Sequence, residues 1–114
     1  MVVYRKDMKV EDKERLRNGE GKTRFTHFCN PENETNVRMM AEITLQPGCS
    51  IGYHEHTGET EYYIILSGSG TVNDNGTECT VNPGDAVITG RGASHSIKNT
   101  GGEPLVFHAV IVTY

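Results

Sequence analysis

The chain has 114 residues, a formal net charge of −4 and no tryptophan, and 35% of its residues are hydrophobic. This length suits one compact domain rather than two. The absence of a basic cluster argues weakly against nucleic acid as a partner. No apolar run approaches the ~20 residues of a membrane span, and the N-terminus lacks the apolar stretch of a signal peptide, so we expect a cytoplasmic protein with no membrane partner. Three cysteines without a CxxC pair predict reduced thiols.

The first 22 residues are polar and charged, and we interpret residues 1–22 as an N-terminal arm that packs on the domain or on a second subunit. Residues 23–114 are predicted to form one β domain. From Thr23 onward the hydrophobic pattern has a period of two. Residues 37–45 alternate an apolar face with a more polar one, which is typical of a strand with one buried face.

The next segment carries the residues with metal-binding chemistry. His54 and His56 are two residues apart, so a strand places both imidazoles on one face. Glu61 stands at the head of the following apolar run, where the returning strand brings its carboxylate back beside them. Two imidazoles and a carboxylate suit a divalent transition metal. Glu59 is an alternative carboxylate, but we expect it to lie in the turn and face solvent.

The second half of the chain continues as short strands separated by glycine and proline turns. Asn75-Gly76 predicts a type I′ hairpin, and residues 94–98 form the predicted strand that carries His95. Residues 105–112 are apolar on both faces, so we expect this last strand to be buried on both. About nine or ten short strands with little helix indicate an all-β sandwich or barrel. In its interior His95 could join the other three residues.

Two groups of residues have the spacing of known motifs. The first motif of the cupin superfamily is matched by Gly48, His54, His56, Glu61 and Gly68, with four residues before the glutamate. The second is matched by Gly84, Gly92, His95 and Asn99, with Gly90 in place of the usual proline. The chain therefore resembles the small single-domain bacterial cupins. This resemblance implies a small antiparallel β-barrel or jelly roll that holds a metal through His54, His56, Glu61 and His95.

Such a site would hold one divalent transition metal, namely Mn, Fe, Co, Ni, Cu or Zn. The leading hypothesis is a metal-dependent enzyme acting on a small polar or carboxylate-bearing molecule, of isomerase, lyase, decarboxylase or dioxygenase type. The alternative is a non-catalytic module that binds or senses a small ligand or a metal. Because dimers are common among such proteins, and because the arm and the last strand offer surfaces for contact, we expect a homodimer.

Four further residues are candidates for contact with a substrate. Tyr63 shares its strand parity with Glu61 and should point inward, where it could orient a substrate or donate a proton. His108, in the last strand, is a candidate base that would act from behind the metal ligands. Arg24 and Arg91 are the cations considered for holding a carboxylate substrate, although a loop arginine is usually solvated.

Overall fold

The computed structural model describes residues 1–114 and folds them into ten β-strands with three single-turn 3-10 helices. The strands are β1 (Val10–Glu14), β2 (Lys22–His27), β3 (Val37–Leu45), β4 (Ser50–Glu55), β5 (Glu59–Ser67), β6 (Gly70–Asp74), β7 (Thr77–Val81), β8 (Ala86–Gly90), β9 (Ser94–Lys98) and β10 (Leu105–Thr113). The short helices are η1 (Arg5–Asp7), η2 (Leu16–Asn18) and η3 (Pro31–Asn33). None of the helices has the length and apolar composition needed to cross a membrane.

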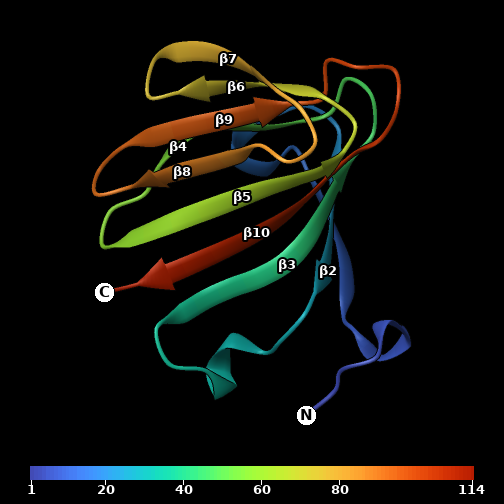
Figure 1. Cartoon of the computed structure of the whole chain (residues 1–114), viewed down its shortest axis with the longest axis vertical. Helices are drawn as coiled ribbons and strands as arrows, with labels where there is room; N and C mark the ends of the chain where they lie inside the picture. The colour runs from blue at the N-terminus through green and yellow to red at the C-terminus, as the bar shows by residue number, and fades with distance from the viewer.

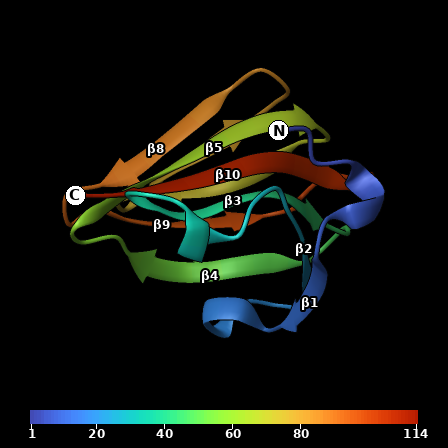
Figure 2. The same cartoon turned by 90° about the horizontal axis from the view of Figure 1, so that it is seen from below.

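The strands form two antiparallel sheets. One sheet has six strands in the order β1-β2-β3-β10-β5-β8, and the other has four in the order β4-β9-β6-β7. Figure 1 shows the long strands β3, β5 and β10 side by side, and in Figure 2 β4 lies in a separate layer facing them. The prediction of an all-β antiparallel jelly roll is confirmed.

The hydrophobic core fills the space between the two sheets. Alternate residues of each long strand point into it, as the period-two pattern predicts. In β10 the buried residues Leu105, Phe107, Ala109 and Ile111 alternate with half-buried ones. The four-stranded sheet contributes its own apolar residues from β4, β6, β7 and β9, namely Ile51, Val72, Val81 and Ile97.

Two asparagines define loops that the sequence pattern marked. Asn75 and Gly76 have φ values of 48° and 102°, so both adopt the left-handed conformation that the predicted type I′ turn between β6 and β7 requires. Asn99 is fully buried, and its amide nitrogen donates to the carbonyl oxygens of Leu45 and Glu103, each at 2.8 Å. The side chain thereby fastens the loop before β10 to the end of β3.

The N-terminal segment is partly built into the larger sheet. β1 pairs antiparallel with β2, from Val10 opposite Thr26 to Glu14 opposite Lys22, and forms the edge of the six-stranded sheet. The expectation that the last strand is buried on both faces is wrong for the single chain. Its outward residues, including Val106 and Val110, remain half-exposed because no element of the fold covers that side of the sheet.

Candidate metal centre

Four potential metal ligands from both sheets meet at one end of the core. His54 lies in β4, His56 directly follows it, Glu61 lies in β5 and His95 in β9. Their ligand atoms all lie within 4.8 Å of one another, and three of the four residues are buried. Nε2 of His56 and Nε2 of His95 are 3.0 Å apart, and each lies 3.1 Å from Oε1 of Glu61. The structure thus brings together the four residues that the sequence singled out.

A bulge in β4 aims the histidines into this cluster. The pairing of β4 with β9 shifts register between Ile51 and His54, so that Gly52 and Tyr53 together lie opposite the single residue Ser96. Bulges of this kind re-aim the side chains that follow them. Ile51 therefore points into the core and His54, three residues later, into the cluster. Simple alternation along the strand misses this irregularity.

Each of the three imidazoles turns Nδ1 away from the cluster toward a fixed partner. The Nδ1 atoms lie 2.7 Å from the carbonyl oxygen of Gly52 for His54, 2.5 Å from Oε2 of Glu59 for His56, and 2.9 Å from Oγ1 of Thr89 for His95. A carbonyl and a carboxylate only accept hydrogen bonds, so Nδ1 of His54 and of His56 carries the proton. In the neutral form of each ring, the lone pair of Nε2 then faces the cluster, an arrangement typical of metal-binding histidines.

Glu59 differs from its sequence-based expectation. The sequence pattern predicts a turn residue that faces solvent, but Glu59 lies at the start of β5 with its side chain only 13% exposed. The guanidinium of Arg38 donates to both of its carboxylate oxygens, at 2.8 and 2.7 Å, and this hydrogen bonding lowers the pKa of Glu59. The ionised carboxylate therefore orients His56 from outside the cluster rather than competing with Glu61 inside it.

The electrostatics of the cluster suit a cation. Burial disfavours the charged form of Glu61, but hydrogen bonds to His56 and His95 outweigh burial and lower its pKa to about 2. Burial lowers the pKa of His54, which favours the neutral imidazole. For His56, burial acts in the same direction, but the carboxylates of Glu61 and Glu59 outweigh it and raise its pKa. Three imidazole nitrogens and one carboxylate oxygen are a donor set that fits a divalent transition metal, with no thiolate to favour a soft one.

The sequence matches the Cupin domain family model over residues 41–112, a span that runs from β3 into β10 and contains all four cluster residues. The chain belongs to the cupin family. The chain is 41% identical over 113 residues to the oxalate-binding protein of Thermotoga maritima, covering 98% of this cupin and 93% of that protein.

Solved structures agree with this assignment. The crystal structure described as a predicted oxalate decarboxylase from Thermotoga maritima superposes with a TM-score of 0.95 and 39% identity, covering 100% of both chains. The polyketide cyclase RemF from Streptomyces resistomycificus superposes with a TM-score of 0.76, covering 99% of this cupin and 78% of that chain. At 22% identity, the second likeness shows a shared fold alone.

A cavity of about 130 Å³ opens beside the cluster of this cupin. Its lining includes His54, His56, Glu61 and Tyr63, together with His27, the cations Lys13, Arg17 and Arg38, and several apolar residues. Lys13 and Arg17 come from β1 and η2, in the segment that the sequence showed only as a polar arm. No periodic pattern there signals a contribution to the site.

The two arginines that the sequence suggested for substrate binding lie elsewhere. Arg24 pairs with Asp12 through its Nε at 2.9 Å, on the outer side of β2. Arg91 lies over the ring of Tyr114, with its guanidinium carbon 5.1 Å from the ring centre. Neither arginine lines the cavity beside the cluster.

Of the two proposed catalytic residues, only Tyr63 reaches the cavity. Its ring stacks on His95 with the ring centres 4.9 Å apart, and burial together with the charge of Glu61 raises its pKa well above the usual value. His108 points to the opposite side of the six-stranded sheet, because its neighbours Phe107 and Ala109 take the inward positions. There it lies 3.3 Å from Oε2 of Glu42, and it does not line the cavity.

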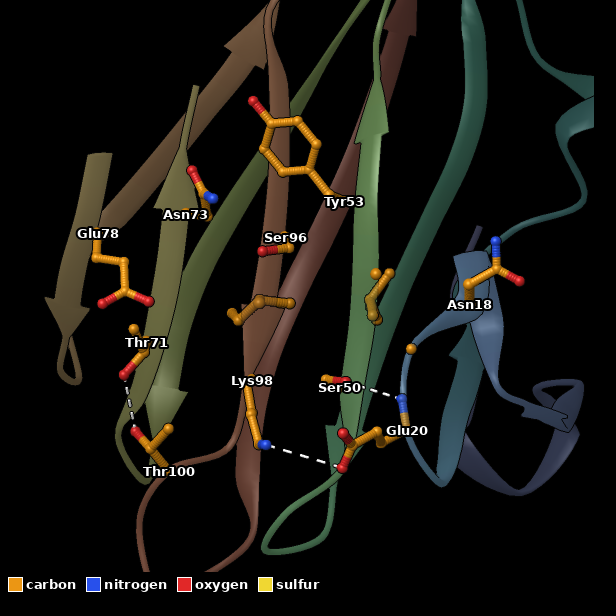
Figure 3. Close-up of a pocket in the computed structure, with 14 residues that line it drawn as sticks. Asn18, Glu20, Ser50, Tyr53, Thr71, Asn73, Glu78, Ser96, Lys98 and Thr100 are labelled. Atoms are coloured by element: carbon orange, nitrogen blue, oxygen red, sulfur yellow. Dashed lines mark hydrogen bonds and ion pairs between the residues drawn. The ribbon is translucent and has the colours of Figure 1, made fainter. Parts of the chain in front are cut away.

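A larger, open hollow of about 500 Å³ lies on the outer face of the four-stranded sheet of this cupin (Figure 3). Its lining is mostly polar and contains none of the four cluster residues. Several of its side chains already pair with one another. Oγ1 of Thr71 lies 3.0 Å from Oγ1 of Thr100, and Nζ of Lys98 lies 3.8 Å from Oε2 of Glu20. This hollow is therefore separate from the candidate metal centre.

Proposed function

We propose that this cupin binds one divalent transition metal through His54, His56, Glu61 and His95, and that this centre binds a small carboxylate ligand of about the size of oxalate. The observation that carries the proposal is the convergence of three imidazole rings on one buried carboxylate, with every outward Nδ1 held by a partner. When bound, the metal supplies positive charge and coordination positions for the oxygen atoms of the ligand.

The cavity supports an anionic ligand. Its volume of about 130 Å³ admits only a few heavy atoms, and Lys13, Arg17 and Arg38 place cations around it in a chain whose net charge is −4. Arg38 is engaged with Glu59, so Lys13 and Arg17 are the cations available to a ligand. A planar guanidinium fits a carboxylate through two parallel hydrogen bonds, and we assign this role to Arg17.

The relatives support the same ligand class. The Thermotoga maritima protein that shares 41% of its residues with this chain is named an oxalate-binding protein. Binding without turnover also agrees with the composition of the cavity, because Glu61 is the sole carboxylate among its lining residues. A cavity of this composition holds no second carboxylate that could exchange a proton with the ligand.

Turnover of the ligand is the second candidate, and Tyr63 is the observation that favours it. Burial keeps its phenol protonated, so the hydroxyl can donate a hydrogen bond to a group held at the cluster. A decarboxylation would fit a carboxylate ligand of this size. The T. maritima structure described as a predicted oxalate decarboxylase points to the same reaction class.

Elemental analysis and calorimetry test the proposal together. Protein purified without added metal should carry about one equivalent of a transition metal, or gain it on incubation. Oxalate should then bind the loaded protein, while protein stripped with a chelator should bind it much more weakly. Malonate and succinate are matched controls, and they should bind less well because the cavity is small. Metal content below about a tenth of an equivalent, with none gained on incubation, would contradict the proposal.

Chromatography of the ligand after incubation separates the two candidates. Oxalate recovered unaltered from an excess over protein supports binding, whereas its steady loss with release of carbon dioxide supports turnover. In the second case, Tyr63→Phe should slow the loss while leaving the metal content unchanged, since the phenol is not among the four ligand residues.

A further inference from the structure

The bulge in β4 that turns His54 toward the cluster also turns Tyr53 to the other side of the four-stranded sheet. Ile51 points into the core, and simple alternation would send Tyr53, two residues later, the same way. Because Gly52 and Tyr53 together lie opposite Ser96, Tyr53 takes an outward position instead and is 51% exposed. Its aromatic ring therefore lines the hollow on this side of the sheet, which we call the outer hollow.

Tyr53 begins a row of polar side chains that crosses all four strands of this sheet. Ser96 lies opposite Asn73 in the pairing of β9 with β6, and Asn73 lies opposite Glu78 in the pairing of β6 with β7. Figure 3 shows these side chains in the outer hollow, with the ring of Tyr53 extending from β4 toward β9. At about 4.8 Å between neighbouring strands, the row is about 14 Å long.

A second row in the outer hollow is closed by contacts within the chain. It comprises Ser50, Lys98 and Thr71, which lie opposite one another across β4, β9 and β6. The hydroxyl of Thr71 is paired with that of Thr100. Glu20 holds the other two, through its carboxylate to Lys98 and its backbone nitrogen to the hydroxyl of Ser50. This row therefore forms a wall of the hollow rather than a surface for a ligand.

The row from Tyr53 to Glu78, in contrast, keeps its polar groups free. The contacts drawn in Figure 3 join only members of the other row and its partners. Oδ1 of Asn73 accepts from the backbone nitrogen of Gly76 at 2.7 Å, which fixes the amide and leaves its two N–H groups for a ligand. The row thus offers hydroxyl groups, N–H donors and one carboxylate beside an aromatic ring.

The charge of the outer hollow disfavours an anion. Glu20, Glu78 and Lys98 are its only charged side chains, and the pairing of Glu20 with Lys98 leaves the carboxylate of Glu78 unpaired. A carboxylate repels anions such as oxalate, but its two oxygens accept hydrogen bonds from neighbouring hydroxyl groups. The exposed ring of Tyr53 adds an apolar surface with a polar tip. Sugars match this combination, because they carry hydroxyl groups around the ring edge and C–H groups on the ring faces.

We propose that the outer hollow binds a short, uncharged oligosaccharide along the row from Tyr53 to Glu78. One sugar ring stacks on Tyr53, and the following rings exchange hydrogen bonds with Ser96, Asn73 and Glu78. A row about 14 Å long suits a chain of a few linked sugar rings. The hollow, at about 500 Å³, is also much larger than the cavity of about 130 Å³ beside the cluster. This site faces away from the core, so it is additional to the candidate metal centre.

Heteronuclear NMR of the full chain, with its mass of 12.6 kDa, tests the proposal. Cellotriose, maltotriose and mannotriose are each titrated to about 20 mM, a range that detects dissociation constants of millimolar order. At least one of them should progressively shift the backbone amide signals of the row, namely Tyr53, Asn73, Glu78 and Ser96. No shift in this row with any of the three sugars, or shifts confined to the cavity beside the cluster, would overturn the proposal. So would binding of trilysine here without binding of any sugar, since that result would identify a site for cations.

Two substitutions test the ring and the carboxylate separately. Tyr53→Ala and Glu78→Gln should each weaken binding of the sugar about tenfold, because each removes one contact of the row. Tyr62→Ala and Glu103→Gln are the matched controls. Tyr62 is 38% exposed on β5 of the other sheet, Glu103 is exposed in the loop before β10, and neither lines the outer hollow.

Circular dichroism and the thermal midpoint report whether each variant folds, and two independent test variants guard against one that does not. Both control variants should bind the sugar like the wild type. Folded Tyr53→Ala and Glu78→Gln variants that kept the wild-type affinity would overturn the proposal. Controls that lost as much affinity as the test variants would do the same.

Discussion

The carbonyl oxygen of Gly52 lies 2.7 Å from Nδ1 of His54, within the bulge that turns His54 toward the cluster. The same glycine lets the backbone of η2 approach β4, since a Cβ at this position would overlap the carbonyl group of Arg17. Gly52 therefore positions two parts of the site. It holds His54 of the cluster, and it allows the close approach of η2, which carries Arg17 of the cavity.

Gly52→Ala is expected to destabilise the fold and to loosen the centre. The added methyl must displace the backbone of Arg17, and overpacking of this kind costs about 1–3 kcal/mol. Urea unfolding measures the loss of stability, and competition with a chelator measures metal retention. Gly102→Ala is the matched control, because a Cβ at Gly102 would meet no atom within 4 Å. Equal stability of the two variants would contradict the tight packing of η2 on β4.

Thr89→Val should weaken metal binding without unfolding the chain. Thr89 is buried, and its hydroxyl lies 2.9 Å from Nδ1 of His95, whereas valine has the same shape and no hydrogen bond. Loss of such an outer partner typically reduces metal affinity about 10–100-fold. Thr71→Val provides the control, since it removes the hydrogen bond to Thr100 in the outer hollow. The hydroxyl of Thr89 would have no role in the centre if both variants retained metal like the wild type.

Arg17→Gln should weaken oxalate binding to the metal-loaded protein by roughly 10–100-fold, the equivalent of one lost charge-assisted contact. Arg15 is an unusually close control. It lies in the same turn, has the same left-handed backbone with φ of 50° against 55° for Arg17, and does not line the cavity. Calorimetric titration of both variants measures the difference. Equal losses for Arg15→Gln and Arg17→Gln would indicate a general charge effect rather than a contact with the ligand.

The carboxyl group of Glu42 should make the stability of the folded chain depend on pH. Hydrogen bonding from Arg5 lowers its pKa below the usual 4.5, against the opposing effect of burial, and His108 is its other side-chain hydrogen-bond partner. The folded state therefore binds the proton less readily than the unfolded state. This contribution is present above pH 4.5 and is lost as the pH falls through the lowered value.

The Glu42→Gln variant should accordingly lose less stability than the wild type as the pH falls from above the usual carboxyl pKa of 4.5 to well below it. Thermal unfolding across this range makes the comparison. The single variant Arg5→Gln and the double variant complete a double-mutant cycle. The second substitution should add little to the loss of stability, because each substitution removes the same contact between Arg5 and Glu42. Parallel pH profiles for the wild type and Glu42→Gln would rule out this linkage.

The sequence pattern predicts the parts of this molecule that depend on spacing and turn chemistry. The antiparallel jelly roll and the Asn75-Gly76 hairpin follow from alternation and glycine turns, and both are present. The structure also brings His54, His56, Glu61 and His95 together, as their motif spacing implies. Local periodicity carries this information because strands fix the direction of alternate side chains.

What the pattern missed depends on contacts between distant segments. The bulge at Gly52 breaks the alternation, and its only local mark is the isolated glycine in the strand. Glu59 reads as a turn residue until Arg38, from β3, is seen to hold it against His56. In the last strand both faces are apolar, so the sequence cannot tell which way His108 points.

The cluster draws its side chains from both layers of the sandwich: His54 and His95 from the four-stranded sheet, and Glu61 from the six-stranded one. An ion held there would act as a cross-link between the layers, and its free concentration would enter the folding equilibrium directly. Above saturation, each tenfold rise in free ion adds about 1.4 kcal/mol to the stability of the native state. The lifetime of this small chain inside a cell would then follow the supply of the ion it binds.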